Sequence, residues 1–122
     1  MTLVSPRKAY KFFKAKMEFT TGPAELNRMI RQRENINVVD VRSPEDYRQE
    51  HIPGAINLPK GEWESCAGLS HEATNVVYCY SEDCHLAAAA ALEFSSQGFP
   101  VMELEGGFNG WKEYNFPIEV TS

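Results

Sequence analysis

Residues 75–92 read NVVYCYSEDCHLAAAAAL, a short β-branched run followed by a cysteine loop and an alanine-rich run. The first part is typical of a buried strand and the last part of a helix, so we expect Cys79 where a strand ends and a helix is about to begin. Backbone N–H groups at a helix start lack intrahelical partners and carry the positive end of the helix dipole. These amides would stabilise a thiolate or a persulfide at Cys79.

Strand and helix patterns alternate on both sides of this stretch. We expect strands at 17–19, 36–40, 55–58, 76–79 and 101–104. We expect helices over 6–15, from 23 to about 30, from 44, over 85–97 and over 109–114, with a helical turn at 62–66. This alternation predicts an α/β fold, with a mainly parallel sheet of about five strands and helices on both faces. Ligands in such sheets bind beyond the carboxyl ends of the strands, where Cys79 is expected.

Length and composition indicate one compact domain. The chain has 122 residues, of which 43% are apolar and 24% charged. No apolar run approaches the ~20 residues that span a bilayer, and the first residues lack a signal-peptide core, so we expect a soluble cytoplasmic protein without membrane contact. Cys66, Cys79 and Cys84 have spacings that suggest neither a disulfide framework nor a zinc site. Free thiols, and no metal or other cofactor, are therefore expected.

The net charge of −5 is unevenly distributed. Residues 1–17 carry five basic residues and no acid, whereas the remaining 7 basic and 17 acidic residues give −10. An acidic body disfavours nucleic-acid binding. We divide the chain into a basic N-terminal helical extension, 1–17, and a domain, 18–122. The helix over 6–15 either packs Tyr10, Phe12 or Phe13 onto the domain, with its lysines in solvent, or contacts a partner or a second copy.

Two further motifs flank the cysteine loop. Residues 38–47 read VVDVRSPEDY and lead to HIPGAINLP at 51–59, while residues 104–111 read LEGGFNGW. In this order the three motifs resemble the rhodanese-like domain family, over roughly residues 18–120. The resemblance implies a rhodanese-like fold to which the N-terminal helix is an addition. It also implies that Asp40 and Arg42 form a structural pair beneath the active-site region, with Glu45 or Glu50 as further partners of the arginine.

The same resemblance implies a sulfurtransferase. In this family a cysteine thiolate attacks the outer sulfur of a donor, holds it as a persulfide and passes it to a second nucleophile. Cys79 is then the catalytic residue. The active-site and substrate-binding loop comprises Tyr80, Ser81, Glu82, Asp83, Cys84 and His85. The expected partners are a small sulfur donor and acceptor or a persulfide-bearing protein.

The loop departs from the family pattern in composition. Many relatives have a basic residue after the cysteine, a glycine in the middle and an arginine at the end, where this chain has Tyr80, Glu82 and Cys84. Glu82 and Asp83 either repel anionic donors and raise the pKa of the thiol, or point to water from the first helical turn. A thiol or protein persulfide is therefore favoured as donor over thiosulfate.

Two other functions remain open. One is a catalytically weak or inactive module that acts in protein binding or regulation. The other is a phosphatase or arsenate reductase, which the short six-residue loop over 79–84 disfavours.

The roles of three loop neighbours also have alternatives. Cys84 is interpreted as a small residue at the helix start without a redox role, the alternative being that it attacks a persulfide or sulfenic acid on Cys79 to form a disulfide. His85 either donates a hydrogen bond toward the loop or is a surface residue. Phe108 is expected in the core or at the rim of the active site.

Overall fold

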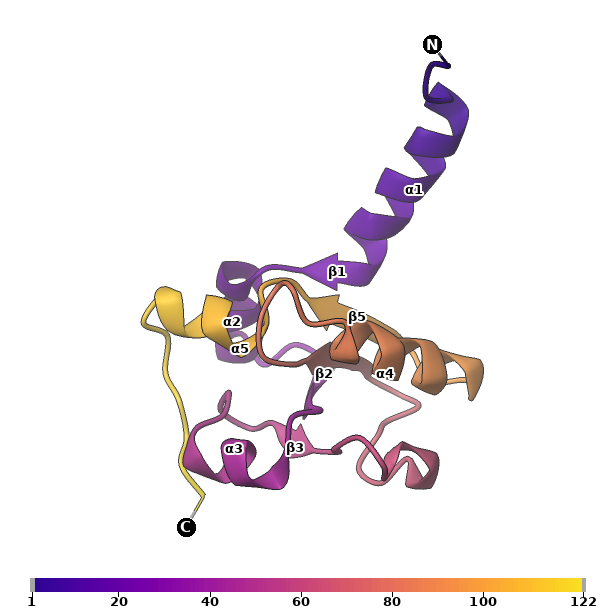
Figure 1. Ribbon diagram of the computed structural model, residues 1–122. Helices are drawn as coiled ribbons and strands as arrows, with labels where there is room; N and C mark the ends of the chain where they lie inside the picture. Colours follow the sequence, from indigo (N-terminus) through magenta and orange to yellow (C-terminus); the bar gives the residue numbers. More distant parts are fainter. Residues whose placement is uncertain (1, 122) are drawn as a thin grey trace.

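The computed structural model describes residues 2–121, which form a five-stranded sheet flanked by helices (Figure 1). The strands are β1 Thr20–Thr21, β2 Ile36–Asp40, β3 Ile56–Asn57, β4 Thr74–Tyr78 and β5 Val101–Leu104. Every neighbouring pair runs parallel, in the order β1-β5-β4-β2-β3. The predicted α/β fold with its parallel sheet is confirmed, and β4 is the central strand.

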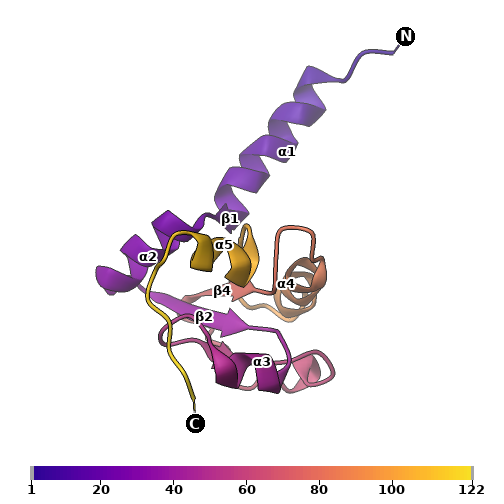
Figure 2. The same cartoon turned by 60° about the vertical axis from the view of Figure 1, so that its left-hand side comes forward.

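Helices cover both faces of this sheet. They are α1 Pro6–Phe19, α2 Pro23–Arg31, α3 Pro44–Gln49, α4 Leu86–Ser96 and α5 Gly107–Glu113, with a 3₁₀ turn, η1, at Trp63–Ser65. Leu26 of α2 and Trp111 of α5 share one core cluster, whereas Phe94 of α4 packs with Trp63 in the other. Figure 1 shows α2 and α5 close together and α4 apart from them, and Figure 2 shows α1 extending away from the sheet. None of the described helices is long and apolar enough to cross a membrane.

The β4–α4 unit places Cys79 just beyond the carboxyl end of the central strand. Val76 and Val77 are fully buried and belong to the cores on opposite faces, which explains the continuous apolar pattern of this strand. Helix α4 returns along the sheet with Ala87, Ala90 and Phe94 buried at helical spacing. Cys79 follows β4 directly, so its position at the carboxyl end of the central strand agrees with the sequence prediction.

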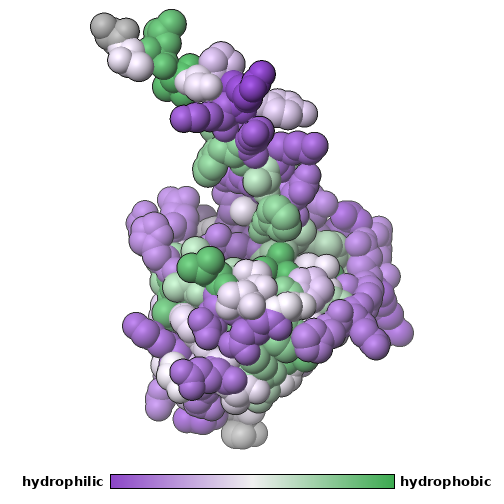
Figure 3. Space-filling view, turned by 90° about the vertical axis from the view of Figure 1, so that its right-hand side faces the viewer, coloured by the Kyte–Doolittle hydropathy of each residue, from purple (hydrophilic) through white to green (hydrophobic). Residues whose placement is uncertain are grey.

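Helix α1 differs from the sequence expectation. It runs over Pro6–Phe19 and contains no buried residue, and Figures 1 and 3 show it standing clear of the body. Phe12 and Phe13 are 61% and 57% exposed, so the expectation that such residues pack onto the domain is wrong. The brief strand expected at 17–19 is wrong as well, because the helix continues to Phe19 and the strand follows at Thr20–Thr21.

Candidate active site

Cys79 lines a cavity of about 200 Å³ beyond the carboxyl ends of β4 and β5. The side chain is only 2% exposed, so the cavity is its route to solvent. The loop contributes Ser81, Glu82 and Cys84, and the other lining residues are Lys16, Thr20, Ala87, Glu103, Leu104, Glu105, Gly106 and Gly107. The fold therefore places Cys79 in the wall of a small cavity.

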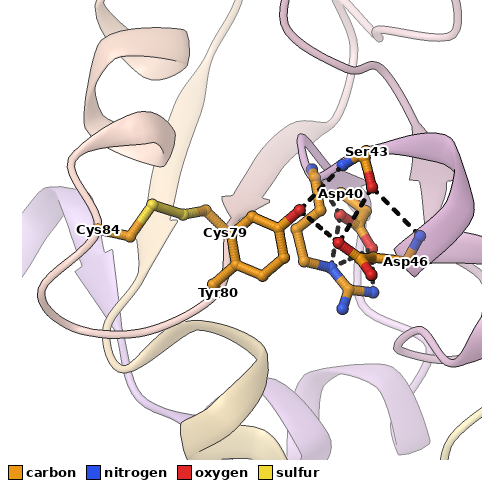
Figure 4. The surroundings of a disulfide bond; sticks show 7 residues. Asp40, Ser43, Asp46, Cys79, Tyr80 and Cys84 are labelled. Carbon is orange, nitrogen blue, oxygen red and sulfur yellow. Dashed lines mark hydrogen bonds and ion pairs between the residues drawn. A yellow bond between two sulfur atoms is a disulfide. The ribbon is translucent and has the colours of Figure 1, made fainter.

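Cys79 and Cys84 are joined by a disulfide bond (Figure 4). Their Cα atoms lie 6.7 Å apart although five positions separate them, because the loop turns back on itself. A hydrogen bond from Cys84 N to Ser81 O, 3.1 Å long, closes that turn. The expectation of three free thiols is thus wrong for two cysteines, and Cys84 is a direct neighbour of Cys79 rather than an isolated small residue. Cys66 is free.

The start of α5 holds the cysteine loop in place. Phe108 N donates to Cys79 O at 2.8 Å, and Asn109 N donates to Tyr80 O at 2.9 Å. Gly107 precedes them with a φ of +59°, and a Cβ atom on it would lie 2.8 Å from both Cys79 O and Ser81 N. Only glycine fits this close approach. The Gly-Gly-Phe motif therefore allows the start of α5 to approach the cysteine loop closely enough to form these backbone hydrogen bonds.

Tyr80 lies on the other side of the loop from the disulfide, against α3 (Figure 4). Its hydroxyl donates to Asp46 Oδ2 at 2.6 Å and accepts a bond from Ser43 N at 3.3 Å. These hydrogen bonds, from Tyr80 first and then from Ser43, lower the pKa of Asp46 below its ordinary value. The structure does not bring Tyr80 into the cavity, and its contacts are those of a residue that ties the loop to the neighbouring helix.

The charges around the cavity are mostly negative. Glu82, Glu103 and Glu105 line it, and Lys16 from α1 lies 3.8 Å from a carboxylate oxygen of Glu105. Burial, and next the negative charge of Glu105, raise the pKa of Glu103 above its ordinary value. Glu82 and Asp83 are both exposed to solvent, but Glu82 also lines the cavity and Asp83 does not. Of the two loop acids, Glu82 is therefore the one placed to repel an anion in the cavity.

Several of these residues were outside the sequence prediction. Lys16, Glu103 and Glu105 reach the cavity only because β5 pairs with β4, and because β1, which follows α1, pairs with β5. The sequence patterns left this order undetermined. The one available signal was the position of Glu105 directly after a strand. His85, by contrast, was predicted near the site and is exposed outside the described lining. Within residues 2–121, no cluster of histidine, cysteine and acidic side chains is arranged to hold a metal ion.

Asp40 and Arg42 form a buried pair that supports the loop from below. Arg42 Nη2 donates to Asp40 Oδ2 at 2.8 Å, and its Nε donates to the same carboxylate. Burial alone would lower the pKa of Arg42, but the hydrogen bond and charge of Asp40 offset it, so that pKa is raised. The Phe108 ring lies 4.2 Å from the guanidinium carbon. This pair thus contacts the same α5 residue that holds Cys79.

Of the two further partners expected for Arg42, the structure shows Glu50, through its backbone carbonyl rather than its carboxylate. Arg42 reaches the backbone carbonyl of Glu50 at 2.5 Å, while the Glu50 carboxylate pairs with Lys112. Glu45 is exposed. Because Asp40 already accepts from two guanidinium nitrogens, the neutral carbonyl of Glu50 gives Arg42 a further partner without burying a second carboxylate.

The fold and the cysteine loop define the class of this protein as a parallel α/β domain with a candidate nucleophilic cysteine after its central strand. The family model of the rhodanese-like domain matches residues 22–114, and the chain belongs to that family. The resemblance drawn from the three sequence motifs is confirmed.

Individual relatives agree with this assignment. The chain is 36% identical over 107 residues to the thiosulfate sulfurtransferase GlpE of Pseudomonas fluorescens, a match that covers 84% of this chain and 93% of the relative. It is 34% identical over 94 residues to the HTH-type transcriptional regulator Rv0324 of Mycobacterium tuberculosis, covering 75% of this chain. It spans only 42% of the length of that regulator. The crystal structure of the BH2092 protein from Bacillus halodurans has a TM-score of 0.86 and 37% identity, covering 96% of this chain and 88% of that one.

Proposed function

We propose that this chain is a sulfurtransferase in which Cys79 carries sulfane sulfur as a persulfide from a donor to a nucleophilic acceptor. The observation that carries the proposal is the place of Cys79, directly after the central strand and in the lining of a small cavity. Membership of the rhodanese-like family and the likeness to a thiosulfate sulfurtransferase support the reaction class.

The reaction begins from the reduced cysteine pair. The Cys79 thiolate attacks the outer sulfur of a thiol persulfide, the sulfur–sulfur bond of the donor breaks, and the donor thiolate leaves. An acceptor then attacks the outer sulfur of the Cys79 persulfide, and the Cys79 thiolate is regenerated. The bonds from the amides of Phe108 and Asn109 hold the loop, so the sulfur keeps its position during both steps.

The charge of the cavity favours one class of donor. Glu82, Glu103 and Glu105 would repel a dianion such as thiosulfate, whereas a thiol persulfide or a protein-bound persulfide brings less negative charge. We therefore propose a thiol or protein persulfide as the preferred donor. A cytoplasmic location stays a prediction, consistent with chemistry that needs reduced thiols.

Formation of thiocyanate from glutathione persulfide and cyanide tests this function. The pre-reduced wild type should turn over, Cys79→Ser should lose at least a hundredfold in rate, and Cys66→Ser should match the wild type because Cys66 lies outside the cavity lining. Turnover by Cys79→Ser at the wild-type rate would contradict the proposal. No turnover by the wild type with persulfide or thiosulfate would favour the binding or regulatory module instead.

A further inference from the structure

Cys84 lies within bonding distance of the Sγ atom of Cys79, the atom to which any transferred sulfur would be attached. Both cysteines line the cavity, and their Sγ atoms are close enough to be bonded. In a Cys79 persulfide that same Sγ atom is the inner sulfur, while the transferred sulfur is the outer one. The loop therefore directs Cys84 at the inner sulfur of the persulfide.

Attack on the inner sulfur has a different product from ordinary sulfur transfer. Attack on the outer sulfur moves it to the attacking nucleophile, whereas attack on the inner sulfur expels it. We propose that Cys84 is an internal reductant that releases the sulfur held by Cys79 as hydrogen sulfide. This inference rests on the proposed function, because it requires a persulfide on Cys79.

The step balances within the chain. The Cys84 thiolate forms a bond to Cys79 Sγ, the bond between Cys79 Sγ and the outer sulfur breaks, and its electron pair leaves with the outer sulfur as HS⁻. The outer sulfur is reduced by two electrons and the two thiols are oxidised to the Cys79–Cys84 disulfide. Two equivalents of a low-molecular-weight thiol, or one dithiol reductase, return the pair to the reduced state by thiol–disulfide exchange.

The surroundings of the pair suit this outcome. Cys84 is partly exposed, so a reductant in solution can reach its sulfur, whereas Cys79 is buried. The released hydrosulfide is an anion in a cavity lined by Glu82, Glu103 and Glu105, and those carboxylates favour its departure.

A single-turnover experiment without reductant tests the proposal. The reduced, desalted chain receives one equivalent of glutathione persulfide, and both the released sulfide and the mass of the protein are measured. We expect the wild type to release close to one sulfide per chain and to form the Cys79–Cys84 disulfide. Cys84→Ser and Cys84→Ala should retain the added sulfur on Cys79 and release at least tenfold less sulfide. Cys66→Ser is the matched control and should behave as the wild type.

The outcomes separate this inference from the proposed function. If no variant or wild-type chain gains sulfur or releases sulfide, the proposed function fails and the inference fails with it. If the wild type retains its persulfide as long as the two Cys84 variants do, Cys79 carries sulfur but the role of Cys84 is wrong. Equal sulfide release from the wild type and the Cys84 variants would overturn that role too, since the liberated glutathione would then be the reductant.

Discussion

Asp40 is the residue on which the support beneath the loop depends. It is fully buried and accepts hydrogen bonds from Arg42 and from the hydroxyl of Tyr78, the latter at 2.7 Å. Burial and the charge of Asp40 raise the pKa of Tyr78 well above its ordinary range, so the phenol remains a donor. Asp40 therefore holds the side chains of both Arg42 and Tyr78 in place.

We expect Asp40→Asn to lower the free energy of unfolding by about 3 kcal/mol, since it leaves a buried guanidinium without a counter-charge. Urea denaturation followed by circular dichroism measures the change. Lys112→Gln is the matched control, because it breaks the partly exposed pair with Glu50 and should cost less than about 1 kcal/mol. A cost below about 1 kcal/mol for Asp40→Asn would show that the buried pair contributes little.

The two loop acids differ in exposure to the cavity, and this yields a second prediction. Glu82→Gln should raise the rate with thiosulfate by roughly tenfold, since relief of ~1.4 kcal/mol of repulsion is a factor of ten. Asp83→Asn removes the same charge from an exposed position outside the cavity lining, and screening should limit its effect to about twofold. Steady-state rates at low and high salt provide the measurement. Equal gains from both variants would mean that general charge, rather than the cavity, determines the rate.

At the scale of elements, the junction between α5 and the cysteine loop positions Cys79, the proposed nucleophile. Gly107→Ala would place a methyl group against the loop backbone, so we expect the initial rate of sulfur transfer to fall at least tenfold. Gly106→Ala is the matched control: its φ is also positive, at +85°, but a Cβ there meets nothing closer than Gly110 Cα at 3.5 Å. Both variants should lose some stability. Equal rates for the two variants would contradict the positioning role.

Substitutions of the exposed aromatic residues of α1 should, by contrast, have little effect on stability. Because Phe12 and Phe13 are exposed, the double variant Phe12→Ser with Phe13→Ser should change the free energy of unfolding by less than about 0.5 kcal/mol. Phe94→Ala in the core should cost about 3–5 kcal/mol. Thermal unfolding at several protein concentrations provides the measurement. A large loss in the free energy of unfolding that depends on protein concentration would identify contact between copies through this helix. Contact with a second copy or with another protein stays a prediction for α1.

The sequence predicted those elements whose signals are local. Apolar patterning predicted the strand at Ile36–Asp40. Gly98 predicted the end of α4, and the structure shows this glycine at a positive φ. The Cys79–Cys84 bond was only the less favoured alternative in the sequence, because spacing along the chain does not show how a loop curls. The acids of β5 were missed because their place in the cavity depends on strand order, which is a property of the assembled sheet.

At the scale of the whole molecule, the basic extension and the acidic domain meet at the cavity. Lys16 and Thr20 come from the end of α1 and from β1, and the remaining lining comes from the domain, including the acidic side chains. The cavity thus lies where β1, β5, the cysteine loop after β4 and the end of α1 meet. Its chemistry depends on the sulfur of Cys79.

Peptide mapping of sulfur-loaded protein tests this central claim most directly. The Cys84→Ser chain, which lacks the internal reductant, is reduced, loaded with one equivalent of glutathione persulfide, alkylated and digested, and the added sulfur is located by mass spectrometry. The account predicts one added sulfur atom on the peptide that contains Cys79 and none on the peptide that contains Cys66. Sulfur on Cys66, or an unmodified Cys79 after exposure to persulfide and to thiosulfate, would contradict it.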